Sequence, residues 1–193
     1  MEESFRFDEE IYENAITIDL SNVANKASAL YSISKRTMDI VSSLVGLILL
    51  SPLFLLVAIL IKLDSKGPII FKQIRIGKNS KPFYIYKFRT MASDAPQNVA
   101  TKDLNDSKKY ITKIGAFLRR TSLDELPQLF NILLGQMTIV GPRPVIEREV
   151  RLLELRKECN VDSILPGITG LAQINGRDNI DDYEKVKYDF EYL

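Results

Sequence analysis

The chain of 193 residues contains no histidine and no tryptophan, and its one cysteine is Cys159. Without histidine, imidazole acid–base catalysis, Ser-His-Asp and Cys-His nucleophiles, and histidine-ligated zinc or iron sites are excluded. A single cysteine cannot form an intrachain disulfide or a paired-cysteine metal site, so we expect a reducing environment. Catalysis by this chain must therefore use carboxylates, lysines, arginines or a bound metal ion.

A large excess of charge is also missing, because the formal net charge is only +1. This balance argues against general nucleic-acid binding. It hides an asymmetry, since residues 1–34 carry seven acidic and two basic residues whereas residues 35–91 carry ten basic and two acidic ones. We interpret residues 1–34 as a solvated acidic extension, whose composition is wrong for a signal peptide.

Charge is absent from one continuous run of 22 residues, 40–61. A helix of that length reaches about 33 Å, just enough to cross a bilayer. Ser51 and Pro52 stand at the middle of the run, where a proline bends or breaks a helix. Each half then reaches only about 15 Å, and basic residues flank both ends of the run. The pattern predicts a re-entrant membrane hairpin over residues 35–66 that enters and leaves by the cytosolic face.

Two other interpretations of this run stay open. It can form a buried helical hairpin in the core of a soluble protein, or one kinked helix that spans the bilayer. Soluble cores seldom need 22 uncharged residues in a row, and cationic residues on both flanks give a single span no clear inside and outside.

The remaining sequence predicts a small, mostly helical α+β domain over residues 67–193. Two runs of alternating apolar residues, 68–76 and 82–90, are separated by a stretch of turn composition and predict a β-hairpin. Alternation places Lys87 and Arg89 on one face of the second strand. Composition predicts a loop at residues 92–109. Periodicity predicts three helices, at residues 112–120, 126–133 and 145–158. The second helix is closed by Gly135, and the third has an apolar stripe of Ile146, Val150 and Leu153.

Two adjacent carboxylates, Asp124 and Glu125, are the first candidates for chemistry. Pro127 is tolerated only in the first turn of a helix, so both acidic residues are expected at or just before a helix N-terminus. That position favours ionised carboxylates and phosphate groups alike. One interpretation is that Asp124 serves only as the N-cap of this helix. Adjacent carboxylates cannot both cap, however, and their repulsion suggests a cation or a reacting group between them.

Arg143 is the second candidate, because prolines on both sides hold its backbone stiff. A rigid guanidinium suits phosphate, although an arginine between prolines can equally brace a turn. A turn-rich stretch at residues 165–179 offers Gln173 and Arg177 as polar candidates, with a scaffold role equally open.

Specificity comes from the combination and order of several motifs. They are Lys35-Arg36-x-x-Asp39, Ser51-Pro52, KGPIIFKQIRIG, YKFRTM, LRRTSLDELPQLFNILLGQMTIVGPRP and PGITGLAQINGRDN. Together they make residues 35–193 similar to the bacterial sugar transferases, the monotopic polyprenyl-phosphate hexose-1-phosphate transferases. Two departures are Tyr183, where the family often has tryptophan, and Ser80, where it usually has glycine.

The resemblance implies an enzyme on the cytosolic face of the bacterial inner membrane. A UDP-sugar binds with magnesium, Asp124 attacks the sugar-linked phosphorus, UMP leaves, and a polyprenyl phosphate then takes the phosphosugar from the covalent intermediate. By this resemblance Asp124 and Glu125 hold Mg²⁺, Arg143 binds phosphate, and the break at Ser51 and Pro52 makes the hairpin re-entrant. Further candidates for contact with the substrates are Lys87, Arg89, Arg119, Gln173 and Arg177.

Two other classes of function stay open beside this one. The chain can be a non-catalytic, membrane-anchored assembly partner of a glycan-synthesis complex, in which the acidic pair is only a cap. It can also be a soluble helical protein with an unusually apolar core. The sequence does not identify the sugar or the glycan pathway, and it leaves a homo-oligomer open.

Overall fold

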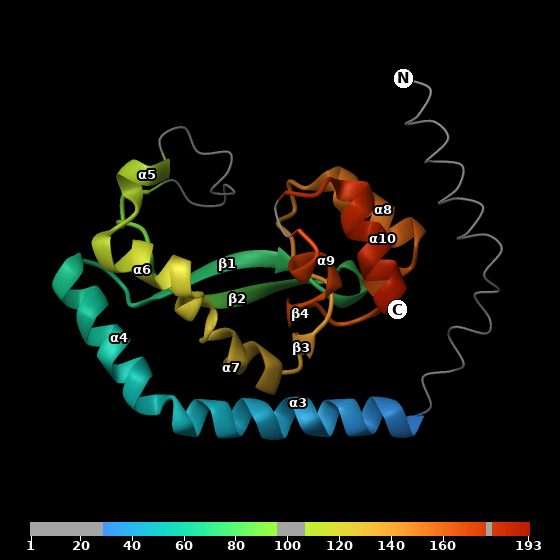
Figure 1. Cartoon of the computed structure of the whole chain (residues 1–193), viewed down its shortest axis with the longest axis horizontal. Helices are drawn as coiled ribbons and strands as arrows, with labels where there is room; N and C mark the ends of the chain where they lie inside the picture. The colour runs from blue at the N-terminus through green and yellow to red at the C-terminus, as the bar shows by residue number, and fades with distance from the viewer. Residues whose placement is uncertain (1–28, 96–106, 177–178) are drawn as a thin grey trace.

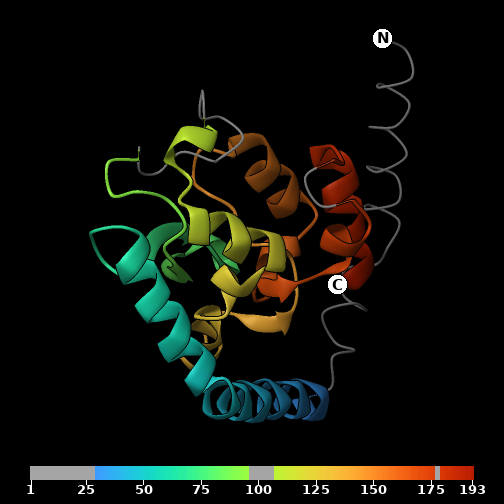
Figure 2. The ribbon, with the colours of Figure 1, turned by 60° about the vertical axis from the view of Figure 1, so that its left-hand side comes forward.

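The computed structural model describes residues 29–95, 107–176 and 179–193. Helices and short strands are mixed along the chain, as predicted for an α+β protein. In chain order, with η for 3-10 helices, the elements are α3 (Ala29–Leu49), α4 (Ser51–Asp64), β1 (Ile70–Ile76), η1 (Lys78–Ser80), β2 (Pro82–Phe88), α5 (Ser107–Tyr110), α6 (Lys113–Thr121), η3 (Leu123–Glu125), α7 (Gln128–Leu133), β3 (Thr138–Val140), α8 (Val150–Glu158), η4 (Val161–Ser163), β4 (Gly167–Thr169), α9 (Leu171–Ile174) and α10 (Asp182–Tyr192). In both views α3 and α4 lie along the border of the molecule (Figure 1, Figure 2).

Two predicted segments fall partly outside the described residues. The acidic extension predicted over residues 1–34 is described only from Ala29, where α3 already begins. The loop predicted over residues 92–109 is described at its two ends only, and its second end forms the short helix α5 instead of a loop.

The helix break is confirmed at the predicted position. α3 ends at Leu49 and α4 begins at Ser51, with Pro52 in its first turn, where the missing amide donor costs no hydrogen bond. The two helices are bent by 60° at this break, an angle compatible with either a broken span or a re-entrant hairpin. In the described residues no helix alone is both long and apolar enough to cross a membrane, whereas Leu30–Leu49 and Ser51–Asp64 meet that test as a bent pair.

Both helices expose apolar side chains, and α3 buries polar ones. Asp39 and Ser43 are only 3% and 0% exposed. In α4 the buried residues are Val57 and Ile61. Apolar residues of the pair that are at least half exposed include Leu30, Ile33, Met38, Val41, Leu44, Ile48, Leu49, Leu55, Leu56 and Leu63. In the described residues, many large apolar side chains of the helix pair therefore lie on the surface and not in the protein core.

Asp39 attaches α3 to the rest of the protein. Its carboxylate accepts hydrogen bonds from the Thr138 hydroxyl at 2.6 Å and from the Ile139 amide at 3.1 Å, both on β3. Lys35, one turn earlier, lies 3.4 Å from Asp39 and also donates to the Thr138 hydroxyl. A buried carboxylate with these partners is satisfied, which explains how α3 tolerates an acidic residue on its packed face.

Arg36 makes a second attachment, to the C-terminal end of α7. Its guanidinium donates to the carbonyl oxygens of Ile132 at 2.7 Å and Leu133 at 3.1 Å. The Ile132 carbonyl also accepts from the Gly135 amide at 3.0 Å, and a cation near a helix C-terminus is favourable. α7 closes at Gly135, whose φ of +78° confirms the predicted glycine stop.

The predicted β-hairpin is confirmed. β1 and β2 pair antiparallel, and the register places Gln73 opposite Ile85. Ile85 packs against Ile132 and Met137 in one of the hydrophobic clusters. The connection includes Ser80 with φ of +57°, a left-handed backbone that glycine adopts at lower cost than serine.

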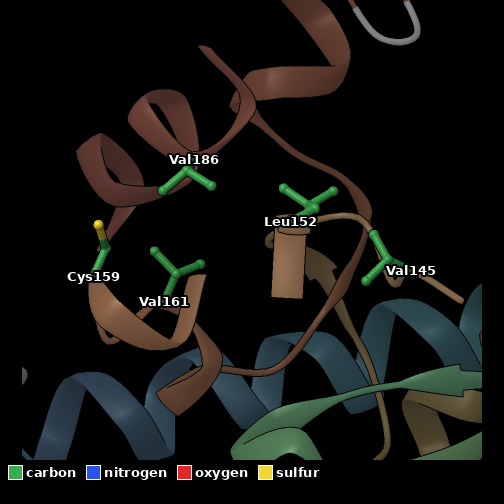
Figure 3. Packing of buried hydrophobic residues seen from close by; sticks show 5 residues of the cluster. All are labelled: Val145, Leu152, Cys159, Val161 and Val186. Carbon is green, nitrogen blue, oxygen red and sulfur yellow. The ribbon is translucent and has the colours of Figure 1, made fainter. Parts of the chain in front are cut away.

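The last predicted helix begins five residues later than expected, at Val150 and not at Val145. The backbone of Val145 instead accepts a hydrogen bond from the Ile76 amide at 2.9 Å, which holds it in an extended bridge. The predicted apolar stripe is consequently wrong at Val150, which is 55% exposed, whereas Leu152 is buried. Leu152 packs with residues of η4 and α10 in a cluster made of Val145, Leu152, Cys159, Val161 and Val186 (Figure 3).

Two short parallel strands, β3 and β4, bring residues 138–144 beside residues 166–170. Val140 pairs with Thr169, and the Gly141 amide donates to the Thr169 carbonyl at 2.9 Å. A Cβ at Gly167 would collide with the backbone of Gly141. Glycine is therefore required at Gly167, where the two backbones approach closely.

Gly115 provides a test of this packing, because a Cβ built on it would collide with the Thr90 carbonyl. We expect Gly115→Ala to lower the free energy of unfolding by about 1–3 kcal/mol, although alanine favours a helix interior. Gly46→Ala is the matched control, since its Cβ meets only the end of the Leu129 side chain at 3.3 Å. Circular dichroism melting in detergent compares the two, and an unchanged melting temperature for Gly115→Ala contradicts the packing.

Candidate active site

Asp124 and Glu125 lie in η3, the 3-10 turn between α6 and α7, and each is only 9% exposed. α6 stops at Ser122, whose backbone is left-handed with φ of +57°, and this reversal turns the chain into η3. The N-cap position of α7 is occupied by Pro127. Both carboxylates thus lie just before a helix, as predicted, but Asp124 does not cap α7.

Glu125 forms ion pairs with two cations from distant segments of the chain. Its Oε1 accepts from Lys87 Nζ at 2.8 Å, from strand β2, and from Arg143 Nη2 at 3.4 Å, from the loop after β3. Burial lowers the pKa of Lys87, and the charge of Glu125 opposes that shift. The structure therefore brings together Glu125, Lys87 and Arg143 from the predicted set of site residues.

Asp124 is the second carboxylate of the site, and its charged form is disfavoured. Burial raises the pKa of Asp124, the charge of Lys87 opposes that shift, Glu125 adds to it, and Arg119 again opposes it. Arg119 lies on α6 and donates from Nε to the Thr90 hydroxyl at 2.8 Å. A poorly solvated carboxylate close to several cations is typical of a functional site, since burial and neighbouring charges shift its pKa in opposite directions.

Arg75 belongs to the same cluster and is not among the site residues that the sequence predicts. Its guanidinium donates to the Pro144 carbonyl at 3.3 Å and to Gln73 Oε1 at 2.7 Å. Burial, followed by the nearby charge of Arg143, lowers the pKa of Arg75 to about 10. Strand alternation contains the signal that identifies it, since Arg75 on β1 pairs with a residue of the Lys87 face of β2.

Other predicted site residues lie elsewhere. Arg89 is 5% exposed and donates to the carbonyls of Ser65 and Lys66, both at 2.7 Å, so it braces the connection between α4 and β1. Gln173 donates to the Ile168 carbonyl at 2.7 Å. Arg177 lies outside the described residues.

The cluster suits a ligand with several phosphate oxygens. Among its described residues four cations, Lys87, Arg75, Arg143 and Arg119, surround the Asp124–Glu125 pair. Within the described ranges no group of three or more His, Cys, Asp or Glu side chains is arranged to hold a metal ion. Two adjacent carboxylates do fit Mg²⁺, which proteins bind through one or two carboxylates together with substrate phosphates.

Residues 30–193 match the family model described as Bacterial sugar transferase. The chain belongs to the bacterial sugar transferase family. This membership covers every element of the described structure from Leu30 onward, including both helices of the bent pair.

Relatives in the bacterial sugar transferase family carry names that describe activities. The chain is 48% identical over 164 residues to the UDP-glucose:undecaprenyl-phosphate glucose-1-phosphate transferase of Klebsiella pneumoniae, covering 82% of this chain and 34% of that protein. It is 51% identical over 149 residues to the exopolysaccharide production protein PSS of Rhizobium leguminosarum, covering 74% of each. It is 38% identical to a UDP-N-acetylgalactosamine-undecaprenyl-phosphate N-acetylgalactosaminephosphotransferase of Aeromonas hydrophila, covering 86% of this chain and 40% of that protein. The chain thus spans about one third of the Klebsiella relative.

Asp124→Asn is expected to raise the melting temperature at neutral pH. An acid whose pKa rises on folding stabilises the fold below its unfolded pKa, and that contribution is lost as the pH rises through the folded pKa. Because burial raises the pKa of Asp124, the wild type should fall further below the variant as the pH rises from about 4, the ordinary pKa of Asp, to neutral pH. Circular dichroism melting at both pH values measures the gap.

Asp94→Asn is the control for this titration, because Asp94 is exposed in a turn. It should leave the melting temperature unchanged at both pH values. A gap between Asp124→Asn and wild type that stays constant, or that closes towards neutral pH, contradicts the raised pKa.

Proposed function

We propose that the chain transfers a hexose 1-phosphate from a UDP-sugar to polyprenyl phosphate through a covalent intermediate on Asp124. The observation that carries the proposal is the buried Asp124–Glu125 pair, with Lys87 and Arg143 both in contact with Glu125 Oε1. The names of the relatives supply the substrate classes, a UDP-sugar donor and undecaprenyl phosphate as acceptor. Which sugar is transferred follows from neither, so glucose and N-acetylgalactosamine are both candidates.

In the first step a carboxylate oxygen of Asp124 attacks the phosphorus that carries the sugar. The bond between this phosphorus and the oxygen that bridges to the second phosphorus breaks, and UMP leaves with the electron pair. An anionic nucleophile must approach an anionic diphosphate, so cations are needed to offset the repulsion. Arg143, Lys87 and Arg119 are placed to do so, and partial desolvation makes Asp124 a stronger nucleophile.

In the second step an oxygen of the polyprenyl phosphate attacks the same phosphorus. The bond to Asp124 breaks, the carboxylate is regenerated, and the product is a polyprenyl-diphospho-sugar. Both nucleophiles are anions, so neither step requires a proton to be removed. The reaction is thus compatible with a chain that has no histidine.

Magnesium fits this site as a partner shared with the donor. Asp124 and Glu125 would hold it through the hard carboxylate oxygens that Mg²⁺ prefers, together with phosphate oxygens of the donor. A magnesium ion bound there would supply positive charge against the phosphates. Glu125 already accepts from two cations of the protein, which keeps one of its oxygens directed at Lys87 and Arg143.

The bent helix pair is proposed to lie in the cytosolic leaflet of the bacterial inner membrane. It exposes apolar side chains over both helices. Asp39 and Arg36 attach α3 to β3 and α7 by hydrogen bonds. In lipid, an apolar outer face is favourable and a hydrogen-bonded polar inner face is required. This placement lets a lipid phosphate reach the site from the bilayer while the UDP-sugar arrives from water.

A covalent intermediate predicts exchange without an acceptor. Labelled UMP should be incorporated into UDP-glucose or UDP-N-acetylgalactosamine by the purified protein in the absence of lipid, since the first step is reversible. Asp124→Asn should lower this exchange by about 10⁴-fold or more, the scale of loss when a nucleophile is removed. Asp94→Asn, on an exposed turn, should exchange at the wild-type rate.

Retained exchange in Asp124→Asn rules out Asp124 as the nucleophile. A non-catalytic assembly partner gives a different pattern: Asp124→Asn then leaves glycan assembly in cells intact, whereas polar substitutions of the exposed apolar residues on α3 disrupt it.

The membrane placement predicts that both flanks of the helix pair face the cytosol. Ser34 and Lys66 are exposed, and cysteines placed there in a Cys159→Ser background can be tested with a membrane-impermeant maleimide. Both should react in inverted membrane vesicles and neither in intact spheroplasts. Labelling of the two positions from opposite sides shows a true span instead.

A further inference from the structure

The three carbonyl groups of residues 142–144 each accept a hydrogen bond from a different part of the chain. The first accepts from the Gly167 amide at 2.8 Å, and the third accepts from the Arg75 guanidinium at 3.3 Å. The middle one, the Arg143 carbonyl, accepts from Arg156 Nη1 at 2.8 Å. Prolines on both sides of Arg143 stiffen this tripeptide further, so its backbone has few ways to move.

Arg156 is itself held by a carboxylate of the last helix. Its Nε and Nη2 donate to the same Oδ2 of Asp189, at 3.0 Å and 2.6 Å. Arg156 lies on α8 and Asp189 on α10, and they are only 7% and 1% exposed. Burial raises the pKa of Asp189, and the charge of Arg156 opposes that shift.

Stability alone is a poor explanation for this buried pair. Desolvation of two charges offsets most of their attraction, and apolar residues of similar volume are often equally stable in their place. Leu152 on α8 and Val186 on α10 already belong to one hydrophobic cluster that joins the two helices (Figure 3). What an apolar pair cannot supply is the donor for the Arg143 carbonyl.

We infer that Arg156 and Asp189 are positioning residues for Arg143, and that α10 is thereby part of the active site. The inference rests on the proposed role of Arg143 in holding the phosphates of the UDP-sugar. Contacts run without a gap from Asp189 to Arg156, to the Arg143 backbone, and through the Arg143 side chain to Glu125. A displacement of about 1 Å at a positioned group can cost about 10²-fold in rate.

The test replaces the ion pair by an apolar pair, Arg156→Met with Asp189→Leu. This variant should keep its melting temperature near that of the wild type, because no unpaired charge is left behind. Its kcat/KM in UMP release from UDP-glucose or UDP-N-acetylgalactosamine should fall about tenfold or more, because the Arg143 carbonyl has lost its donor. Full kcat/KM in the stably folded variant overturns the inference.

Arg156→Lys is the second variant, in case the apolar pair does not fold. A lysine keeps the charge opposite Asp189 but lacks the planar fork that reaches two acceptors at once. It should show the same loss of kcat/KM with a smaller change in stability. A loss of stability without a loss of kcat/KM per folded molecule overturns the inference.

A double-mutant cycle with Arg143→Gln separates positioning from general destabilisation. If the pair acts through Arg143, the apolar pair should lower kcat/KM no further once the Arg143 guanidinium is absent. Losses that multiply across the cycle contradict the inference.

Leu152→Ala is the matched control on α8, since it opens a cavity in the same cluster without touching Arg143. It should lower the melting temperature, leave kcat/KM per folded molecule unchanged, and show no coupling to Arg143→Gln. Coupling as strong as that of the apolar pair counts against a specific role. If UMP exchange survives in Asp124→Asn, the proposed function itself is rejected. If Asp124→Asn loses UMP exchange while the apolar pair keeps full kcat/KM, only the positioning role is rejected.

Discussion

The contact of Glu125 with both Lys87 and Arg143 is the interaction on which the architecture of the site depends. It joins three segments that are far apart in sequence: strand β2, the turn η3 and the loop after β3. Each of these charges is costly to bury alone, and each becomes tolerable only beside the others. Asp124 takes its electrostatic environment from this group, because it adjoins Glu125 and lies within the field of Lys87. The secondary structure around the site serves mainly to deliver these charges to one point.

A second constraint governs α3, whose relation to the protein core is inverted. In a water-soluble helix the apolar face packs and the polar face is solvated. Here Asp39 and Ser43 face the protein, while leucines and isoleucines face outward. Hydrogen bonds from Thr138 and Ile139 hold Asp39 on this inner face, whereas the buried Ser43 hydroxyl has no hydrogen-bond partner among the described residues.

Features that depend on neighbouring residues could be predicted from the sequence. The break at Pro52 and the stop at Gly135 are of this kind, since each follows from the backbone limits of one residue. Features that depend on distant partners could not. The start of α8 was misplaced because Val145 bonds to Ile76, and alternation selected Arg89 without showing that its guanidinium binds carbonyls of the preceding connection. Alternation also places Arg75 on the Lys87 side of the hairpin, but its contact with the Pro144 carbonyl depends on a distant partner.

The inverted packing of α3 changes how sequence variation along this helix should be interpreted. In most helices the apolar positions are the constrained ones and the polar positions vary freely. On α3 an outward leucine has only to remain apolar, whereas Asp39 has two hydrogen-bond donors at fixed positions and no other side chain matches its length and charge. Substitutions among Leu, Ile, Val and Met should therefore accumulate on this helix, and its few polar positions should be its most intolerant.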